Sequence, residues 1–388
     1  MVRMNGLAAL RFFAEAAENP AGVFGGFRRG GNKIMKNAGK QSEQLIYMKS
    51  VDGHRQSYFD LLGPMYGLSP VTGQISGRLF QRLVNAKYLL FASLDEHMFL
   101  FVVISIIRSV LGRPTVALFL RAQKCFEYGK LIYPLKRFVF RALRRVRLLT
   151  VVTITPFEVA PRYAEVARAG VCDPQYWDLH DGIALRMPGC TRLSDEVRER
   201  AVSRRICCVL GALGIGKGLG FLVEALERHP QIVNHVLIVC AGRVMPGNDD
   251  LAARLLAQGA LIFDRFISDA ELESLYGIAD AIWACYAPDY DQASGVFGRA
   301  IQWGVPVIVR EGSVIAAFAD RACADYHPVA FDAYESLAAI LDRLSSRQEV
   351  TPALSEFDRT HLVGTWRRQF DDTVRAGLEC GKVANAKD

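Results

Sequence analysis

The sequence contains no C-x-x-C pair, although it has nine cysteines. Their number is odd and they are scattered along the chain, a pattern that favours a reducing compartment over a disulfide framework. The opening residues, MVRMNGLAALRFFAEAAE, include no long apolar signal core. We therefore expect a cytoplasmic protein.

The sequence also lacks a long hydrophobic run. The best candidate, Met98 to Ile107, supplies ten apolar residues before Arg108 interrupts it, whereas a membrane-spanning helix needs roughly 18 or more. With 51% hydrophobic and 22% charged residues the chain is not a disordered polymer. Its 388 residues predict two domains, each large enough to bury its own core.

The formal charge of +7 is too small for this length to indicate nucleic-acid binding. The basic residues concentrate in two stretches, Arg28 to Lys40 and Lys130 to Arg147, neither of which contains an acid. The second stretch has apolar residues at helical spacing and includes Phe138 and Phe140. It is either a solvated helix with a core-facing stripe or a helix that lies on an anionic membrane surface.

Strand-like and helix-like runs alternate through both halves of the chain, which predicts an α/β fold with parallel sheets. The expected strands are Gln44 to Lys49, Tyr88 to Ser93, Val116 to Leu120 and Leu148 to Ile154 in the first half, and Ile206 to Leu210, Val236 to Cys240, Ala281 to Cys285 and Pro306 to Val309 in the second. Between Asp173 and Ser203 the pattern breaks, as expected of an interdomain crossing.

A glycine-rich segment, GALGIGKGLG, lies between an expected strand and an expected helix. Gly211, Gly216 and Lys217 have the spacing of a P-loop, but residue 218 is Gly where a magnesium-binding Ser or Thr is required, so an NTPase is disfavoured. What remains is a turn whose glycines allow a phosphate to approach the backbone, with Lys217 as a cation. The same sequence could also be only a turn.

A second segment, Tyr286 to Val309, places a polar loop after a buried strand and then opens a helix at Ser294. Ser294 caps that helix, and the free amides of Gly295 and Val296 would form an anion site. On its own this is also what an ordinary capped helix looks like. However, both this loop and Lys217 follow strands of one parallel sheet, where such sheets bind ligands.

At this point the chain resembles the nucleotide-sugar-binding half of the GT-B glycosyltransferases, in particular family 4 enzymes of bacterial polysaccharide synthesis. The resemblance covers about residues 206–344. It rests on the Lys217-Gly218 turn with the helix FLVEALERHP, the strand HVLIVCAGRV, the segment FDRFISDAELESLYGIADAIW, the Q-A-S-G-V sequence, and the A-x-x-x-G-V-P-V-I pattern that starts at Ala300.

The resemblance implies a GT-B fold, in which two Rossmann-like domains with parallel sheets face a cleft. It implies that Gly216, Lys217 and Gly218 bind the donor diphosphate together with the turn at Ser294, Gly295 and Val296. Tyr286, Asp291 and Gln292 would line the sugar, with Asp291 among the catalytic residues. Neither a metal nor another cofactor is implied, because cations and helix termini neutralise the leaving diphosphate in this fold.

Three positions depart from the family pattern. The E-x7-E pair of many members falls on Asp291 and Arg299, so the carboxylate that would hold the ribose is a cation. An Arg that commonly precedes the K-G turn falls on Gly211, and Arg299 could either compensate for its loss or be a solvated side chain. The His often found after an acceptor-domain strand is replaced by Arg121, a candidate acceptor-side residue.

Other polar residues at expected strand ends are candidates on the acceptor side. Asp95 and His97 follow the second strand at the edge where a catalytic base would sit, although adjacent polar residues there are more often simple loop. His54 follows the first strand and would face the cleft or lie at the surface. Asp289 and Asp291 form a literal D-x-D, which in this position is more simply a chance match than a metal site.

We therefore expect a glycosyltransferase that moves a hexose from a nucleotide sugar to a saccharide or lipid-linked saccharide, without nucleic acid as a partner. Two alternatives stay open: a non-catalytic nucleotide-sugar-binding or scaffold protein, and an epimerase or hydrolase on the same fold. The predicted parts are a basic arm (1–43), an acceptor-side domain (44–185), an interdomain crossing (186–204), a nucleotide-sugar-binding domain (205–345) and a C-terminal helical segment (346–388). If the basic helix lies on a membrane, the protein would be located peripherally at the inner face of the membrane.

Overall fold

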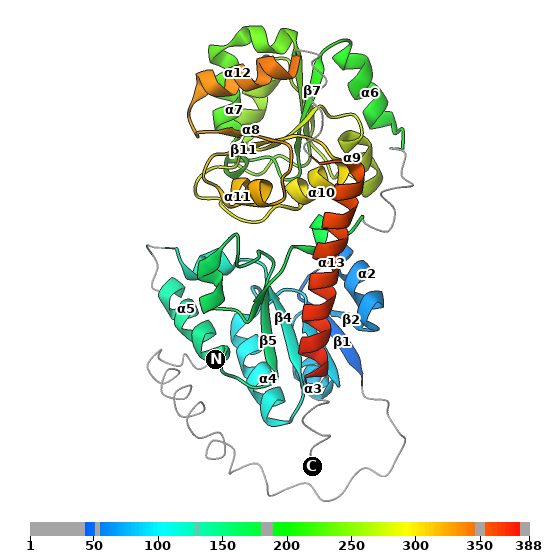
Figure 1. Ribbon diagram of the computed structural model, residues 1–388, viewed down its shortest axis with the longest axis vertical. Helices are drawn as coiled ribbons and strands as arrows, with labels where there is room; N and C mark the ends of the chain where they lie inside the picture. Colours follow the sequence, from blue (N-terminus) through cyan, green and yellow to red (C-terminus); the bar gives the residue numbers. More distant parts are fainter. Residues whose placement is uncertain are drawn as a thin grey trace, which may run out of the picture.

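The computed structural model describes residues 43–50, 55–127, 129, 132–179, 189–345 and 354–380. Within them the chain forms two six-stranded parallel sheets with helices packed around each, as the alternating pattern predicts (Figure 1). The two halves are stacked along the long axis of the molecule, and the last helix runs along one side of both. His54 and the basic arm at 28–40 lie outside the described residues.

The first sheet has the strand order β2-β1-β3-β4-β5-β6. Its strands are β1 (Gln44–Met48), β2 (Ser69–Thr72), β3 (Tyr88–Phe91), β4 (Thr115–Phe119), β5 (Leu149–Thr153) and β6 (Ala169–Gly170). Its helices are α2 (Arg55–Tyr66), α3 (Gly77–Asn85), α4 (Met98–Val110) and α5 (Ile132–Leu143), with short 3-10 helices η1 (Ala122–Cys125) and η2 (Pro161–Glu165). The four strands expected in this half are confirmed, and β2 and β6 are additional edge strands.

The second sheet has the order β12-β11-β10-β7-β8-β9. Its strands are β7 (Arg205–Leu210), β8 (Val236–Ala241), β9 (Leu261–Phe263), β10 (Ala281–Ala284), β11 (Val307–Arg310) and β12 (Tyr326–Val329). Its helices are α7 (Leu219–Arg228), α8 (Asp249–Ala257), α9 (Asp269–Tyr276), α10 (Gly295–Trp303), α11 (Val314–Arg321) and α12 (Tyr334–Ser345). In this half too, the central strands are the predicted ones.

The region predicted as an interdomain crossing contains the capped helix α6 (Arg192–Ala201), which the sequence analysis did not anticipate. Before it, the 3-10 helix η3 (Pro174–Tyr176) packs against α10. The terminal helix α13 (Glu356–Glu379) leaves the second half and returns to the first. At Gly377 a Cβ atom would lie 2.7 Å from Val116 Cγ2, so glycine lets α13 pack directly on β4.

Residues 174–179, at the start of the break between Asp173 and Ser203 and called the crossing below, are held on α10 by buried polar contacts. Arg299 Nη2 lies 2.8 Å from Asp178 Oδ2, and Gln302 Nε2 donates to Gln175 O at 3.0 Å and to Asp178 Oδ1 at 3.0 Å. Gln302 Oε1 in turn accepts from Leu179 N at 3.0 Å. Breaking a buried pair of this kind would strand a charge away from water, so the crossing and α10 move together.

A fully buried arginine of α4 ties the start of the inner strand β4 to helix α3. Arg108 has 0% exposure and donates to the carbonyl oxygens of Leu83, Val84 and Ala86. It also donates to Pro114 O and, at 2.8 Å, to Thr115 Oγ1. Since these acceptors are themselves buried, one side chain satisfies the polar groups at the end of α3 and at the start of β4. No helix among the described residues is both long and apolar enough to cross a bilayer.

Replacing Arg108 with Met should lower the free energy of unfolding by about 3 to 5 kcal/mol, because the substitution leaves several buried carbonyl groups without donors. Urea denaturation measures this. Arg78, an exposed residue of the adjacent helix α3, provides the matched control, and Arg78→Met should change stability by less than about 0.5 kcal/mol. An Arg108→Met protein as stable as the control would contradict the assignment.

Candidate functional site

The Lys217 turn is shaped by its contacts with β10. Lys217 ends a short 3-10 helix after β7, and Gly218 follows in the left-handed region with φ of 71°. A Cβ atom at residue 218 would lie only 2.1 Å from Cys285 O, so no other residue fits without a backbone shift. The indole nitrogen of Trp283 donates to Lys217 O at 2.7 Å. The turn is therefore fixed in position before any ligand binds.

The Lys217 side chain points at the second predicted element. Its Nζ donates to the Tyr286 hydroxyl at 2.9 Å and lies 4.0 Å from the centre of the Tyr286 ring and 5.8 Å from that of Tyr290. The Tyr286 hydroxyl lies 2.8 Å from Ser294 Oγ. A continuous chain of contacts thus links Lys217 through Tyr286 to Ser294. The structure brings together the two segments that the sequence analysis paired.

The N-terminus of α10 has the predicted cap. Ser294 Oγ accepts from Phe297 N at 3.4 Å, and Ser294 N donates to the Tyr176 hydroxyl of the crossing at 3.4 Å. Within the described part of the chain, no group accepts a hydrogen bond from the amides of Gly295 or Val296. Free amides at a helix N-terminus can donate hydrogen bonds to an anion, and the positive end of the helix dipole also attracts negative charge.

Tyr286 is only 4% exposed and serves as the bridge between Lys217 and Ser294. Contact with the sugar, the role implied by the family resemblance, stays a prediction for Tyr286 and Asp291. Gln292 lies at the domain boundary, because its Oε1 accepts from Gln123 Nε2 of the first domain at 2.8 Å. Gly216, whose Cβ position would be 3.3 Å from the Tyr290 ring, packs beneath the same loop.

Arg310 is a cation of this site that the sequence analysis missed. It ends β11, donates through Nε to Tyr286 O at 3.1 Å, and pairs through Nη2 with Asp291 Oδ1 at 3.0 Å. Asp291 Oδ1 also accepts from Val314 N at 2.9 Å. A charged residue that directly ends a buried strand was the available signal, since the carboxyl ends of these strands form the ligand-binding edge.

Arg299 is not the solvated side chain that one of its two alternatives predicted. It is buried, and its guanidinium is engaged by Asp178 at 2.8 Å and by Asp269 at 3.4 Å. Asp178 raises the pKa of Arg299 further, although burial opposes this. The observed role of Arg299 is to hold the interdomain crossing, and donor binding by this residue stays a prediction without a contact to support it.

On the acceptor side, Asp95 sits at the carboxyl end of β3. Its Oδ2 accepts from the backbone amides of Leu120 at 3.0 Å and Arg121 at 3.2 Å. Burial raises the pKa of Asp95 to about 6, although these hydrogen bonds and the nearby Arg121 and Lys136 oppose the shift. A carboxyl that titrates near neutral pH can exchange a proton with a hydroxyl of a substrate.

His97 lies at the same edge. Its ring stacks on Tyr47 with centroids 6.4 Å apart, and its Nε2 is buried with no hydrogen-bond partner among the described residues. Burial, followed by the charge of Lys49, lowers the pKa of His97, so the neutral ring is the dominant form at neutral pH. The structure therefore leaves His97 Nε2 without a hydrogen-bond partner two residues after Asp95.

Asp291, the second acid of the literal D-x-D, pairs with Arg310 and accepts a hydrogen bond from Val314 N. In the part of the chain described by the structure, no three His, Cys, Asp or Glu side chains are grouped so as to hold a metal ion. A separate cavity of about 480 Å³ lies between the domains along α13, and none of the predicted site residues lines it.

No family model of known proteins matches the sequence, and no curated protein matches it. Solved structures do. The Anabaena protein HepE in complex with UDP and glucose is 13% identical with a TM-score of 0.60, over 87% of this chain and 100% of that one. A glycosyltransferase from Rickettsia africae is 13% identical with a TM-score of 0.59, over 89% and 98% of the two chains.

A UDP-forming trehalose-phosphate synthase from Burkholderia xenovorans is 11% identical with a TM-score of 0.51, over 78% of this chain and 80% of that one. At such identities the similarity concerns the fold. Combined with the two six-stranded parallel sheets, it confirms the predicted architecture. This chain has the GT-B fold of glycosyltransferases.

Proposed function

We propose that this protein is a glycosyltransferase that moves a hexose from a nucleoside diphosphate sugar to a hydroxyl of a saccharide or lipid-linked saccharide, in the assembly of a cell-surface polysaccharide. The observation that carries the proposal is the contact chain from Lys217 through Tyr286 to Ser294, beside the free amides of α10. HepE was solved with UDP and glucose, which makes a UDP-hexose the first donor to test.

In this mechanism the donor diphosphate replaces Tyr286 as the partner of the Lys217 ammonium group. The amides of Gly295 and Val296 bind the same anion. As the bond between the sugar and the diphosphate breaks, negative charge grows on the leaving oxygen, and these fixed donors stabilise it more in the transition state than in the ground state. Arg310 holds the loop that carries Asp291 in place for this purpose. No metal takes part in the proposed mechanism.

The acceptor hydroxyl would approach from the first domain. Asp95 is the preferred base because its pKa of about 6 leaves it ionised at neutral pH yet basic enough to take a proton. His97, with its unpartnered Nε2, is the second candidate. His54, the remaining acceptor-side candidate, lies outside the described residues.

We further propose that helix α5 rests on an anionic membrane surface. Ile132, Leu135 and Phe138 are 43%, 39% and 60% exposed and are spaced three residues apart, so they form one apolar strip on the outside of the helix. Arg144 and Arg145 are exposed just beyond it. Exposed apolar side chains flanked by cations fit the surface of a bilayer that contains anionic lipids.

The rival is a non-catalytic nucleotide-sugar-binding protein. The commitment of Arg299 to Asp178 and the presence of Gly211 in place of a cation favour it, since both remove groups that the family pattern supplies. It predicts nucleotide binding without turnover. The transferase predicts release of a nucleoside diphosphate that rises with added acceptor, whereas a hydrolase or epimerase would turn over without any acceptor.

Lys217→Ala should weaken binding of UDP and UDP-glucose at least tenfold, because the ammonium group and its hydrogen bonds to the diphosphate are lost. The shift in melting temperature caused by a panel of nucleoside diphosphates and their sugars measures this. A ligand at one hundred times its Kd adds about 2.7 kcal/mol to the free energy of unfolding, which is enough to shift the melting temperature. Lys87, which lies over the Tyr88 ring at 5.2 Å, is the matched control. Equal stabilisation of wild type, Lys217→Ala and Lys87→Ala by UDP would count against the proposed donor site.

The transfer rate should fall as pH drops through about 6, because Asp95 is then protonated. Its folded pKa is raised above the unfolded value, so the native state carries an ionisation penalty that is absent at low pH and complete above pH 6. Asp95→Asn removes both effects. Urea unfolding at pH 5 and 8 should show the variant gaining stability over wild type by about 1 kcal/mol more at the higher pH. If the stability difference between the variant and wild type were the same at both pH values, the raised pKa of Asp95 would be refuted.

Vesicle flotation tests the membrane proposal. The protein should bind vesicles of phosphatidylglycerol and phosphatidylcholine but not pure phosphatidylcholine. Phe138→Ser with Leu135→Ser should reduce binding at least tenfold, because burial of two apolar side chains is lost. Phe266→Ser, at a residue 63% exposed in the second domain, is the control and should bind normally. Undiminished binding by the α5 variant would exclude this helix as the contact.

A further inference from the structure

A group of cations surrounds the 3-10 helix η1 at the acceptor side of the site. The charges of Arg121 and Lys136 both act on the buried carboxyl of Asp95, and Lys136 also acts on the thiol of Cys125 in η1. Arg162 reaches the same place from η2, with its guanidinium carbon 5.2 Å from the centre of the Phe126 ring that follows η1. Helix α5, which carries Lys136, packs against both η1 and η2, so the three cations, called the patch below, lie on neighbouring elements around η1.

The carboxylates near this patch are already occupied. Glu165 pairs with Arg137 at 2.6 Å and with Arg141 at 2.9 Å, and Glu127 pairs with Lys124 at 3.0 Å. Asp95 Oδ2 accepts the two backbone amides described above. Across the described ranges, no carboxylate lies within ion-pair distance of the three convergent cations, which are Arg121, Lys136 and Arg162.

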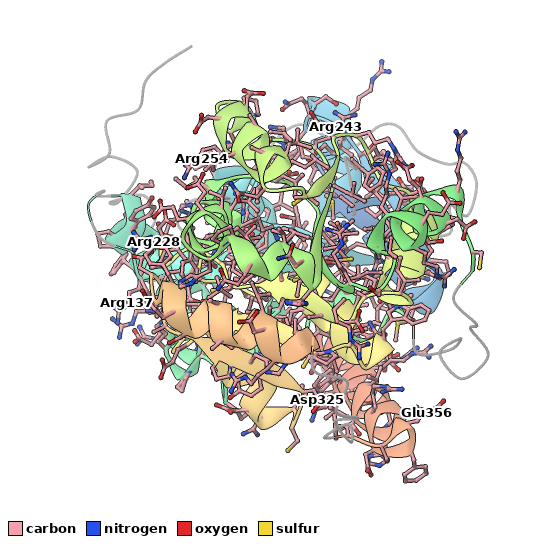
Figure 2. All side chains as sticks on the ribbon, turned by 90° about the horizontal axis from the view of Figure 1, so that it is seen from above. Arg137, Arg228, Arg243, Arg254, Asp325 and Glu356 are labelled. Atoms are coloured by element: carbon pink, nitrogen blue, oxygen red, sulfur yellow. The ribbon has the colours of Figure 1, made fainter. Side chains whose placement is uncertain are left out.

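Aromatic rings hold one of these cations in place without neutralising it. The rings of Phe126 and Tyr163 stack with centroids 5.8 Å apart, and the Arg162 guanidinium lies over both, at 5.2 and 5.7 Å. A guanidinium held on ring faces can still donate in-plane N–H groups to an oxyanion, and Arg162 uses part of its donors on the Tyr163 side chain. Arg137, labelled at the edge of the view in Figure 2, covers the same Phe126 ring at 4.9 Å. Arg121 and Arg162 are exposed and Lys136 is half-buried, so a ligand can reach all three.

The patch adjoins the donor loop. Gln123, within η1, donates to Gln292 Oε1 at 2.8 Å across the domain boundary. Tyr163, next to Arg162, is close enough to Asp291 that this charge helps burial to raise the tyrosine pKa. A ligand on the patch would therefore lie beside the position where the donor sugar is expected.

We propose that Arg121, Lys136 and Arg162 bind a phosphate or diphosphate group carried by the acceptor, so that the acceptor is an anionic saccharide. This rests on the proposed function, since it names the substrate class of the same site. Two anionic substrates must then meet in one cleft, and separate sets of cations keep their charges apart. Planar guanidinium forks and an ammonium group are the side chains best suited to a phosphate.

The test measures binding of inorganic diphosphate by calorimetry to protein already saturated with UDP, so that the donor site is filled. Wild type should bind the probe in the millimolar range or tighter, and higher salt should weaken binding. The triple variant Arg121→Gln, Lys136→Gln, Arg162→Gln should bind it at least tenfold more weakly. The control triple Arg78→Gln, Lys87→Gln, Arg200→Gln carries the same charge change at exposed residues elsewhere and should bind as wild type does.

Two further probes separate the sources of the phosphate. Glucose 6-phosphate represents a soluble sugar phosphate and a short prenyl diphosphate in detergent represents a lipid-linked acceptor, and each is compared with its uncharged alcohol. Tighter binding of one phosphorylated probe, lost in the triple variant, names the source. Failure of every phosphorylated probe to bind the wild type, or equal binding by both triple variants, would overturn the proposal.

Binding of UDP to the same proteins reports on the proposed function independently. The triple variant should keep the UDP affinity of wild type, because its three residues belong to the first domain, whereas the Lys217 turn and α10 belong to the second. If wild type does not bind UDP, the proposed donor site is contradicted. If wild type binds UDP but does not bind the diphosphate probe, the acceptor patch is contradicted. In the case where wild type does not bind UDP, inorganic diphosphate is titrated into protein without UDP. The comparison of the two triple variants then still decides whether the diphosphate binds at the patch.

Discussion

The arrangement of the two domains depends on the buried contact between Arg299 and Asp178. A paired charge inside a protein is held by its partner, because separation would leave it desolvated. Through this contact the crossing lies against α10. Gly298 of α10 leaves room for the Tyr176 ring, because a Cβ atom at residue 298 would lie only 2.1 Å from Tyr176 Cδ1. Tyr176 then reaches Ser294 N, so the same contact that joins the domains also positions the helix end proposed to bind the donor.

Much of the fold could be predicted from the sequence because the central strands are continuous apolar runs. The strands that were missed, β2, β6, β9 and β12, are all at the edges of the two sheets. Edge strands are short and partly exposed, so their sequences, such as SPVT and YHPV, lack the apolar signal. Helix α6 was hidden for a similar reason, since it is polar on most of its surface and packs only through a few side chains.

The site was predictable where its chemistry is local. The Lys217 turn and the Ser294 cap are encoded within a few residues, and the structure has both. The roles of Arg299 and Arg310 depend on partners far away in sequence, Asp178 and Asp291, and the bridging position of Tyr286 depends on two separate loops. Sequence patterns report the residue at such positions but not its partner, so they could not show that Asp178 holds Arg299.

The central claim is that a nucleoside diphosphate binds between Lys217 and the N-terminus of α10. A crystal structure of the protein with UDP tests it most directly. The account predicts a diphosphate within hydrogen-bond distance of Lys217 Nζ and of the amides of Gly295 and Val296, with the ammonium group released from Tyr286. UDP bound elsewhere, or bound with Lys217 still on Tyr286 and the amides unoccupied, would contradict it.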